Sequence, residues 1–352
     1  MLHHQSNKML RRVCEDNKYR RLTPNTEMTQ FPLRHDENQY LHLIEDILSE
    51  GTKEEGRNGT TFAVFGAAMH FSLNDRRVPF LTTKRLAWKT CLKELLWFVR
   101  GETDNALLQA QNVHIWDGNA SREFLDSRGL TDRNEGDLGP IYGFQWRNFG
   151  GDYGCDNNVN ANANANANVN ANANANANAN ANANANANCK TKGVDQLQSV
   201  IDALKDPERR TSRRLIVSAW NPCQLDEMAL PPCHVLMQFH VTHGTLLSCS
   251  LYQRSGDVGL GVPFNIASYS ILTHLLAHHC GLEAHEFVYY LGNAHIYDDH
   301  VAALQEQVKR EPHDFPKIAI RALHEDIDDY ELNDFEVQGY RCHDAIPMTM
   351  RQ

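Results

Sequence analysis

Apolar residues recur along the chain with two spacings, one typical of amphipathic helices and one typical of strands. The helical spacing predicts helices over residues 36–50, 87–100, 194–204, 264–280 and 298–309. Strand-like alternation or short apolar runs occur at residues 61–73, 214–220, 235–241, 246–254, 287–291 and 317–322. The two kinds of element are mixed without a strict βαβ repeat. We therefore expect an α+β fold with a large mixed β-sheet and packed helices.

Residues at the helix ends support two of these assignments. Asp36 is the expected N-cap of the first helix, and Gly51 follows its last residue. The helix over 87–100 is the most apolar of the set and is closed by Gly101. Both helices therefore have a chemical stop signal in addition to an apolar stripe.

One stretch breaks the pattern. Residues 157–188 alternate Asn with small apolar residues and contain 17 Asn and 13 Ala in 32 positions. Both residue types are poor strand formers, and Asn also disfavours helix. We interpret the stretch as a low-complexity surface loop inserted into a domain, because it cannot bury enough to offset its ordering entropy. Cys155 and Cys189 flank it, and a disulfide between them is not expected in a reducing cytosol.

The acidic charge is distributed unevenly. The chain carries a formal charge of −10, yet residues 1–35 hold seven Lys or Arg and three Asp or Glu, which leaves −14 on the rest. This balance argues against a non-specific polyanion binder, so nucleic-acid binding is not required. Any bound phosphate must be met by a few convergent arginines. We interpret residues 1–35 as a basic, disordered N-terminal extension and residues 36–352 as one domain.

The apolar runs and the cysteines bear on the compartment. No apolar run reaches membrane-spanning length, and the N-terminus lacks the apolar segment of a secretory signal. The Arg and Lys content there resembles a transit peptide, but Glu15 and Asp16 argue against one. Nine cysteines without a CxxC pair are typical of reduced thiols. We expect a cytoplasmic protein, with a nuclear or mitochondrial pool left open.

Cys233 is the first candidate for chemistry. It follows Pro231 and Pro232 directly before a predicted strand, which fixes its backbone. A cysteine there is either a rigidly presented nucleophile or a packed residue at the start of a strand. A nucleophile needs a cationic setting that favours the thiolate. Arginines that could supply it, or bind a phosphate monoester, are Arg57, Arg213, Arg214 and Arg254.

Glu94 lies in the most apolar predicted helix. At 100° per residue, its neighbours on that helix are Thr90, Cys91, Trp97 and Phe98. A carboxyl group in such surroundings should have a raised pKa, which suits acid–base catalysis. The alternative is a glutamate at the helix margin that is paired with a lysine.

Two further patterns resemble known sites without meeting their requirements. His274, His278 and His279 share a helix but have no carboxylate at motif spacing, so we expect no metal site. The three glycines within residues 256–261 do not run from strand to helix in the order of a dinucleotide-binding loop. We therefore expect no nicotinamide cofactor.

Eight segments, taken in order, resemble thymidylate synthase in its eukaryotic or viral form. They are PFLTTKR (79–85), KELLWFVRG (93–101), IWDGNASREFLD (115–126), GDLGPIYGFQWR (136–147), SRRLIVSAWNP (212–222), ALPPCH (229–234), LYQRSGDVGLGVPFNIASY (251–269) and GNAHIYDDH (292–300). The resemblance covers nearly all of residues 36–350 apart from the Asn-Ala tract. It implies a catalytic domain over residues 36–352 whose large mixed sheet pairs sheet-to-sheet in a homodimer.

The family implies a methyltransferase that converts dUMP to dTMP. The implied co-substrate is methylenetetrahydrofolate, which supplies both the one-carbon unit and the hydride, with no metal and no nicotinamide. Cys233 would add to uracil C6 and so make C5 reactive toward the folate methylene. The other implied catalytic residues are Glu94, Tyr142, Arg254 and Asn265.

The family also implies binding residues. Those for dUMP are Arg57, Arg213, Arg214, Arg254, Ser255, Gly256, Asp257, Asn265, His295, Ile296 and Tyr297. Those for the reduced folate are Lys84, Ile115, Trp116, Asp257, Gly261 and Arg351. Arg213 and Arg214 would cross to the partner subunit's site.

Three places depart from the family pattern, and one is Ala87, where the family often has an aromatic residue or His near the folate. Asn293 stands where the family usually has Asp, which removes a charge beside the sugar site. Arg351 and Gln352 replace the usual small and aliphatic C-terminal residues, which bears on closure over the folate.

Three alternatives to this activity can be stated. A pyrimidine hydroxymethylase would add water in place of hydride, and Asn265 favours uracil over cytosine but does not settle the product. A catalytically inactive dimer would act as an RNA-binding or scaffold protein, although the catalytic positions are intact. A reductase–synthase fusion is not expected, because 35 residues are too few for a second enzyme domain. Dihydrofolate reductase should then be a separate chain.

Overall fold

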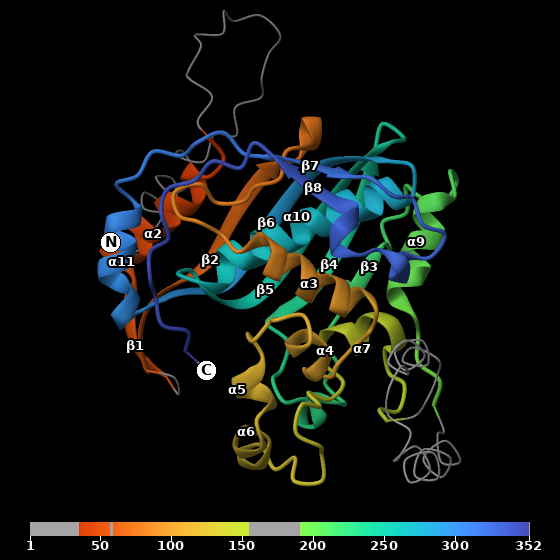
Figure 1. Cartoon of the computed structure of the whole chain (residues 1–352), viewed down its shortest axis with the longest axis horizontal. Coiled ribbons are helices and arrows are strands. Elements are labelled where there is room, and N and C mark those ends of the chain that lie inside the picture. Colours follow the sequence, from red (N-terminus) through yellow and green to blue (C-terminus); the bar gives the residue numbers. More distant parts are fainter. Residues whose placement is uncertain (1–34, 57–58, 155–190, 352) are drawn as a thin grey trace, which may run out of the picture. The chain divides into compact units, whose positions relative to one another are not determined.

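A six-stranded sheet forms the centre of the computed structural model, which describes residues 35–56, 59–154 and 191–351 (Figure 1). Its strands are β1 (Thr52–Gly56), β2 (Gly59–Ser72), β3 (Ile216–Ser218), β4 (His234–Thr242), β5 (Leu246–Asp257) and β6 (Glu283–Tyr297). Their order is β1-β2-β6-β5-β4-β3, with β5 and β6 parallel and all other neighbours antiparallel. The prediction of an α+β fold with a large mixed sheet is confirmed.

Several predictions fall outside the described residues. They concern residues 1–34, Arg57, and the Asn-Ala tract with its flanking cysteines, Cys155 and Cys189. The described residues belong to one compact unit, His35–Gln352. The assignments of the extension and of the inserted loop stay predictions.

The helices and a second, small sheet complete the fold. The helices are α2 (Asn38–Glu50), α3 (Trp88–Val99), α4 (Ala106–Gln109), α5 (Asp117–Ala120), α6 (Arg122–Ser127), α7 (Tyr142–Asn148), α9 (Gln196–Lys205), α10 (Gly261–His279) and α11 (Val301–Gln307). Short 3-10 turns are η1 (Asn74–Arg76), η3 (Leu225–Glu227), η4 (Asp298–His300), η5 (Ile327–Asp329) and η6 (Leu332–Asp334). The small antiparallel sheet consists of β7 (Lys317–Ile320) and β8 (Phe335–Gln338).

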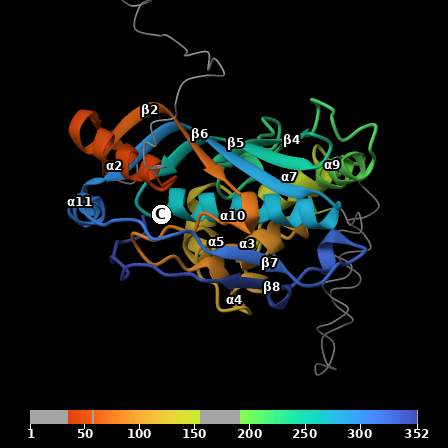
Figure 2. The same cartoon turned by 90° about the horizontal axis from the view of Figure 1, so that it is seen from above.

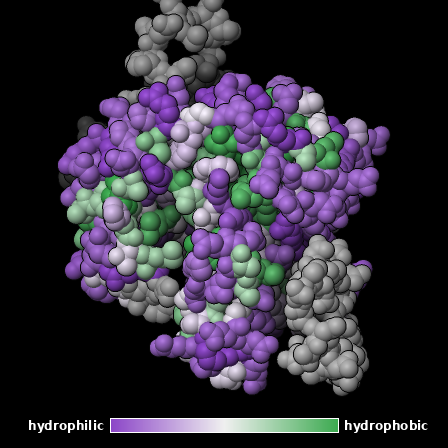
Figure 3. All heavy atoms as spheres, in the orientation of Figure 1, coloured by the Kyte–Doolittle hydropathy of each residue, from purple (hydrophilic) through white to green (hydrophobic). Residues whose placement is uncertain are grey.

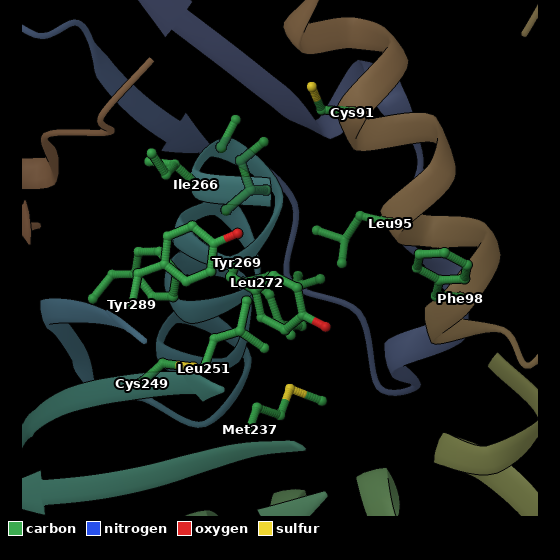
Figure 4. Close-up of a cluster of buried hydrophobic side chains, with 14 of the residues drawn as sticks. Cys91, Leu95, Phe98, Met237, Cys249, Leu251, Ile266, Tyr269, Leu272 and Tyr289 are labelled. Atoms are coloured by element: carbon green, nitrogen blue, oxygen red, sulfur yellow. The ribbon is translucent and has the colours of Figure 1, made fainter. Parts of the chain in front are cut away.

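Helix α10 holds the layers together. It packs against β5 and β6 on one side and against α3 on another, and from above it lies between the large sheet and β7–β8 (Figure 2). Its apolar residues occur all round the helix, as expected for a helix that is buried on every side. Figure 4 shows Ile266, Tyr269 and Leu272 of α10 between Leu95 and Phe98 of α3 and the side chains of the sheet.

The start of α2 differs from the predicted cap. The helix begins at Asn38, and Asp36 does not cap it, because its Oδ2 accepts the N–H of Ser72 at 2.9 Å instead. Glu37 is completely buried, and its carboxylate accepts the N–H and hydroxyl groups of both Thr82 and Thr83 at 2.6–3.0 Å. The two acidic side chains thus join α2 to β2 and to the segment before α3. The predicted N-cap was wrong because tertiary donors outcompeted the local one.

Other boundaries moved for similar reasons. Strand β1 has only exposed side chains, so no apolar alternation could reveal it. Strand β6 extends beyond its apolar run because β5 pairs with it as far as His295 and β2 as far as Tyr297. The helix predicted over 298–309 divides into η4 and the shorter α11.

The buried His274 makes stability depend on pH. Its Nε2 lies 2.7 Å from the carbonyl oxygen of Arg77, and burial lowers the pKa of His274 to about 4. Between that pH and the ordinary histidine pKa near 6.5, the unfolded chain binds the proton more tightly. Stability is therefore complete above pH 6.5 and falls as the pH is lowered toward 4, by about 3 kcal/mol from this residue.

We expect His274→Gln to flatten the dependence of the unfolding free energy on pH between 4.5 and 6.5. Urea unfolding at several pH values measures this slope. His240→Gln is the matched control, because His240 is an exposed histidine of β4. A slope in His274→Gln equal to that of the control would contradict the assignment.

Candidate active site

Cys233 sits where the chain enters β4. Its backbone N–H donates a 2.7 Å hydrogen bond to the Tyr142 hydroxyl, and its Sγ lies 3.7 Å from Nη2 of Arg254. Pro231 and Pro232 carry no N–H, so only their carbonyl oxygens are available for main-chain hydrogen bonds, and both accept from Arg254 of β5. The thiol is thereby held between a tyrosine hydroxyl and a guanidinium.

Arg254 is oriented by the backbone before Cys233. Its Nε donates to the carbonyl of Pro232 at 2.9 Å, and its Nη2 donates to the carbonyl of Pro231 at 3.0 Å. Its own N–H bonds the carbonyl of Cys233 at 3.0 Å, beside the antiparallel pairing of β4 with β5. The guanidinium also lies 5.7 Å from the centre of the Trp220 ring. The two proline carbonyls thus orient the planar guanidinium of Arg254 toward the thiol.

Two opposing effects act on the thiol. Burial raises the pKa of Cys233, while the charge of Arg254 and the contact with Tyr142 lower it, and burial is the larger effect. The expectation that Arg254 favours the thiolate is correct in direction. In this arrangement it reduces a pKa that would otherwise be higher still.

Glu94 has the surroundings that its helical position predicts. It is only 7% exposed, and burial raises the pKa of its carboxyl to about 7. The indole Nε1–H of Trp116 donates to Oε1 of Glu94 at 2.8 Å and opposes that rise. The alternative pairing with a lysine is wrong. The Trp116 partner comes from a loop 22 positions away, so helix spacing could not reveal it.

The bond from Trp116 gives a testable pKa change. We expect Trp116→Phe to move the titration of Glu94 upward by about one pH unit, because the N–H stabilises the ionised carboxylate more than the acid. The carboxyl band in infrared spectra, assigned by its loss in Glu94→Gln, measures the midpoint. Trp88→Phe is the control, because the Trp88 ring stacks on Phe80 instead. An unchanged midpoint would contradict the assigned bond.

Tyr142 is enclosed by aromatic rings. Its ring centre lies 4.9 Å from Phe98, 6.2 Å from Trp116 and 4.9 Å from His234. This packing, together with burial, keeps the phenol protonated, because burial raises the pKa of Tyr142 well above its usual value. Its hydroxyl is thus fixed beside the Cys233 backbone.

His234 was not among the predicted site residues. It is the first residue of β4, and burial lowers the pKa of its ring to about 4, so it is neutral at pH 7. The side chain of Asn265, itself 7% exposed on α10, is a hydrogen-bond partner of this ring. His234 Nδ1 is buried without a hydrogen-bond partner among the described residues. Its position directly after Cys233 was the only signal in the sequence.

The turn after β5 gathers predicted folate residues. Oδ1 of Asp257 accepts the N–H of Gly259 at 2.8 Å, and Nζ of Lys84 donates to the carbonyl oxygen of Gly259. Burial lowers the pKa of Lys84 to about 8, although Asp257 opposes this. Lys84 therefore helps to fix the turn, while its contact with a folate glutamate tail stays a prediction. Gly261 begins α10 directly after this turn.

The end of β6 lies beside this turn. His295 pairs with Asp257 of β5, and its Nδ1 lies 2.9 Å from Oδ1 of Asn293. The rings of His295 and Tyr297 meet edge to face at 5.3 Å. Ile296, which separates these two residues in the strand, is completely buried. Its side chain points to the opposite face of the strand, so only its main chain lies on the side of the two rings.

Neighbouring predicted residues follow from the same pairing. Ser255 lies opposite Asn293 and Gly256 opposite Ala294 in the parallel β5–β6 ladder. A Cβ at Gly256 would come within 2.9 Å of methyl carbons of Leu291 and Val262, so a larger residue there would require these side chains to move. Ile115 is partly buried and packs on the core next to Trp116.

Arg213 and Arg214 are not part of this cluster. Both are exposed before β3, and their side chains have no hydrogen bond or ion pair with any residue of the described ranges. Arg214 lines a cavity of about 460 Å³ between α9 and β3. The structure thus brings Cys233, Arg254 and Tyr142 together but leaves these two arginines pointing to solvent.

The comparisons with known proteins bear on what this site is. Residues 38–352 match the family described as thymidylate synthase. The chain belongs to the thymidylate synthase family. The resemblance drawn from the eight sequence segments is therefore confirmed.

Individual relatives differ in how much of their length is matched. The bifunctional dihydrofolate reductase-thymidylate synthase of Leishmania major is 49% identical over 322 residues, which is 91% of this chain and 56% of that protein. Human thymidylate synthase is 47% identical over 318 residues, which is 90% of this chain and 91% of that protein. The equine herpesvirus 2 thymidylate synthase is 48% identical, with 90% and 98% covered. The chain thus spans a little over half of the bifunctional relatives and nearly all of the shorter ones.

Membrane-spanning helices and metal-binding clusters are both absent from the described residues. No helix in the described ranges is long and apolar enough to cross a membrane. Within residues 35–56, 59–154 and 191–351, no three His, Cys, Asp or Glu side chains are grouped so that they could hold a metal ion.

Proposed function

We propose that this protein is a thymidylate synthase, which converts dUMP to dTMP by reductive methylation with methylenetetrahydrofolate. The observation that carries the proposal is the Cys233 thiol, held 3.7 Å from the Arg254 guanidinium, in a chain of this family. Human thymidylate synthase is 47% identical over nearly the full length of both chains, which supports the same activity.

The residues around the thiol suit each step of that reaction. Cys233 adds through its thiolate to uracil C6, with Arg254 compensating the charge and the dUMP phosphate bound by the same guanidinium and Ser255. Negative charge then develops at O4, where Asn265 offers an amide and Glu94 a carboxyl whose pKa burial raises to about 7. Uracil C5 attacks the folate methylene as the bond from that carbon to one folate nitrogen breaks, and Tyr142 assists removal of the C5 proton. The remaining methylene–nitrogen bond then breaks and frees tetrahydrofolate. Hydride from tetrahydrofolate adds to the methylene and expels the Cys233 thiolate from C6, which leaves dTMP and dihydrofolate.

The remaining predicted contacts form part of the proposal. His295 and Tyr297 would hold the ribose, and the turn at Asp257 with Trp116 would face the folate pterin. Asn293 takes the place of a carboxylate but still contacts His295 through its amide oxygen, so the ring keeps an orienting partner. We therefore expect the protein to be active with Asn293 in place of the carboxylate.

A direct assay tests the proposal. Incubation with dUMP and methylenetetrahydrofolate should raise the dihydrofolate absorbance, and chromatography with mass detection should identify dTMP. Hydroxymethyl-dUMP without dihydrofolate would assign the hydroxymethylase activity instead. No product in the presence of both substrates would favour the scaffold alternative.

We also propose a homodimer formed through the large sheet. Four large apolar side chains of its strands are 40–84% exposed, namely Phe65, Ile216, Tyr252 and Tyr290. Tyr252 and Tyr290 are neighbours across β5 and β6, which makes their surface continuous. The solvent-facing Arg213 and Arg214 would then complete the partner subunit's phosphate site. Mixing Cys233→Ala with an Arg213→Glu/Arg214→Glu double variant should restore activity that neither has alone, and failure to do so in a mixed dimer would overturn the crossing.

A further inference from the structure

The C-terminal segment, residues 346–351, is held at one short stretch of the chain. The carbonyl oxygen of Thr349 lies 2.7 Å from Nε2 of His300, within η4. Two residues later, Nη2 of Arg351 lies 3.0 Å from Oδ2 of Asp299. In Figure 1 the segment descends past α11 toward the C label, and Figure 3 shows apolar residues on the same side of this face.

His300 connects that segment to the Asp257 turn. The histidine is completely buried, and its second ring nitrogen, Nδ1, lies 3.6 Å from Oδ1 of Asp257. Nδ1 has no hydrogen-bond partner within the described ranges. The same carboxylate oxygen accepts the Gly259 N–H, and a Cβ at Gly259 would lie 3.2 Å from Sδ of Met348. One imidazole therefore faces the C-terminal main chain on one edge and the turn on the other.

The charge around the ring favours its protonated form. Burial lowers the pKa of His300, but Asp257, the Thr349 carbonyl and Asp299 raise it by more. An imidazolium has two N–H donors and no acceptor, which matches a carbonyl on one side and a carboxylate on the other. The Tyr297 ring packs edge to face at 5.6 Å and limits how far the imidazole can turn.

Arg351 provides a second, more exposed fastening. Besides Asp299, its guanidinium lies 3.5 Å from Oδ1 of Asp298 and 5.9 Å from the centre of the Tyr297 ring. An exposed ion pair alone is weak, but the planar fork here meets two carboxylates and an aromatic face. The acidic Asp298-Asp299 pair and the C-terminal arginine are thus complementary in charge.

We propose that His300 is a positioning residue for the folate half of the reaction, linking the C-terminal segment to the Asp257 turn, with the Arg351–Asp299 pair as its second fastening. This inference rests on the proposed function, because it assigns the reduced folate to the Asp257 side of the site. His300 would touch neither substrate. It would act by keeping Asp257 and Met348 in place together when the pterin binds.

Paired variants separate the two edges of the ring. The amide nitrogen of Gln can replace Nε2, whereas that of Asn can replace Nδ1 but does not reach Thr349. We expect His300→Asn to release the C-terminal residues to carboxypeptidase Y about tenfold faster, as followed by intact mass, and His300→Gln to stay near wild type. Equal release rates in both variants and the wild type would overturn the anchor. This measurement requires no enzymatic activity, so it remains decisive even where the proposed function fails.

Steady-state kinetics test the positioning role. His300→Asn should raise the KM for methylenetetrahydrofolate about tenfold, while the dissociation constant for dUMP, measured by calorimetry, stays within about twofold. Equal losses for both ligands would indicate a merely structural role and overturn the inference. An inactive wild type would instead refute the proposed function.

If the His300 variants do not fold, exchanging the charges of Arg351 and Asp299 still tests the proposal. Arg351→Glu and Asp299→Arg should each raise the folate KM, by about threefold, and the double variant should recover much of that loss. Arg341→Glu is the matched control, because Arg341 is an exposed arginine of the same C-terminal region without an ion pair among the described residues. Additive losses in the double variant would overturn the second fastening.

Discussion

Cys233→Ala is expected to reduce the turnover of dUMP by about 10⁴-fold or more, because no other group in the cluster can form the bond to uracil C6. The Cys233 N–H that bonds Tyr142 is a backbone group, so the substitution leaves that contact in place. The three hydrogen bonds of Arg254 to backbone carbonyls likewise do not need the sulfur. The fold and the arginine should therefore survive the change.

The control for this variant is Cys223→Ala. Cys223 is an exposed free cysteine ten positions earlier, and its removal should leave turnover within about twofold. Circular dichroism and sedimentation should show the same fold and assembly for both variants. Residual turnover of Cys233→Ala above a tenth of the wild type would contradict its role as nucleophile.

Arg254→Met is expected to produce the second largest loss, about 10³-fold in kcat/KM for dUMP. Two effects combine, because the variant loses a phosphate ligand and the cation that lowers the pKa of Cys233. Burial then raises the pKa of the Cys233 thiol with no positive charge to oppose it, so a smaller fraction of the residue is thiolate. Two Pro carbonyls also lose their donors, which loosens the entry into β4.

The pH dependence of alkylation separates these effects. The rate of Cys233 modification by iodoacetamide should rise with pH along a curve that moves to higher pH in Arg254→Met. Arg254→Lys keeps the charge but not the planar fork, so it should restore most of the curve and little of the turnover. Arg76→Met, at an exposed position of η1, is the matched control. A curve unmoved in Arg254→Met would contradict the electrostatic role of the guanidinium.

Local patterns predicted much of the fold and part of the site. The apolar spacing of α3 was enough to place Glu94 in a desolvated position, because helix geometry fixes neighbours within one turn. Two prolines before a strand were enough to present Cys233. The alternation over residues 246–254 predicted β5, in which Leu247, Cys249 and Leu251 are buried.

The sequence pattern could not predict contacts between segments that are distant along the chain. Trp116 bonds Glu94 from another loop, and the carboxylate of Asp36 bonds Ser72 across 36 positions. The role of His300 depends on its distance to Thr349, which no spacing encodes. Strand β1 forms through pairing with β2 alone, since none of its side chains is buried. Each of these features is set by tertiary geometry.

The proposed activity requires that Cys233 activate uracil C5 for methyl transfer. The measurement is the release of tritium from C5-labelled dUMP, recorded together with dihydrofolate absorbance in the presence of methylenetetrahydrofolate. We expect equal amounts of tritium and dihydrofolate from the wild type, and neither from Cys233→Ala. Tritium release that persists in Cys233→Ala, or release in the wild type without dihydrofolate, would contradict this role of Cys233.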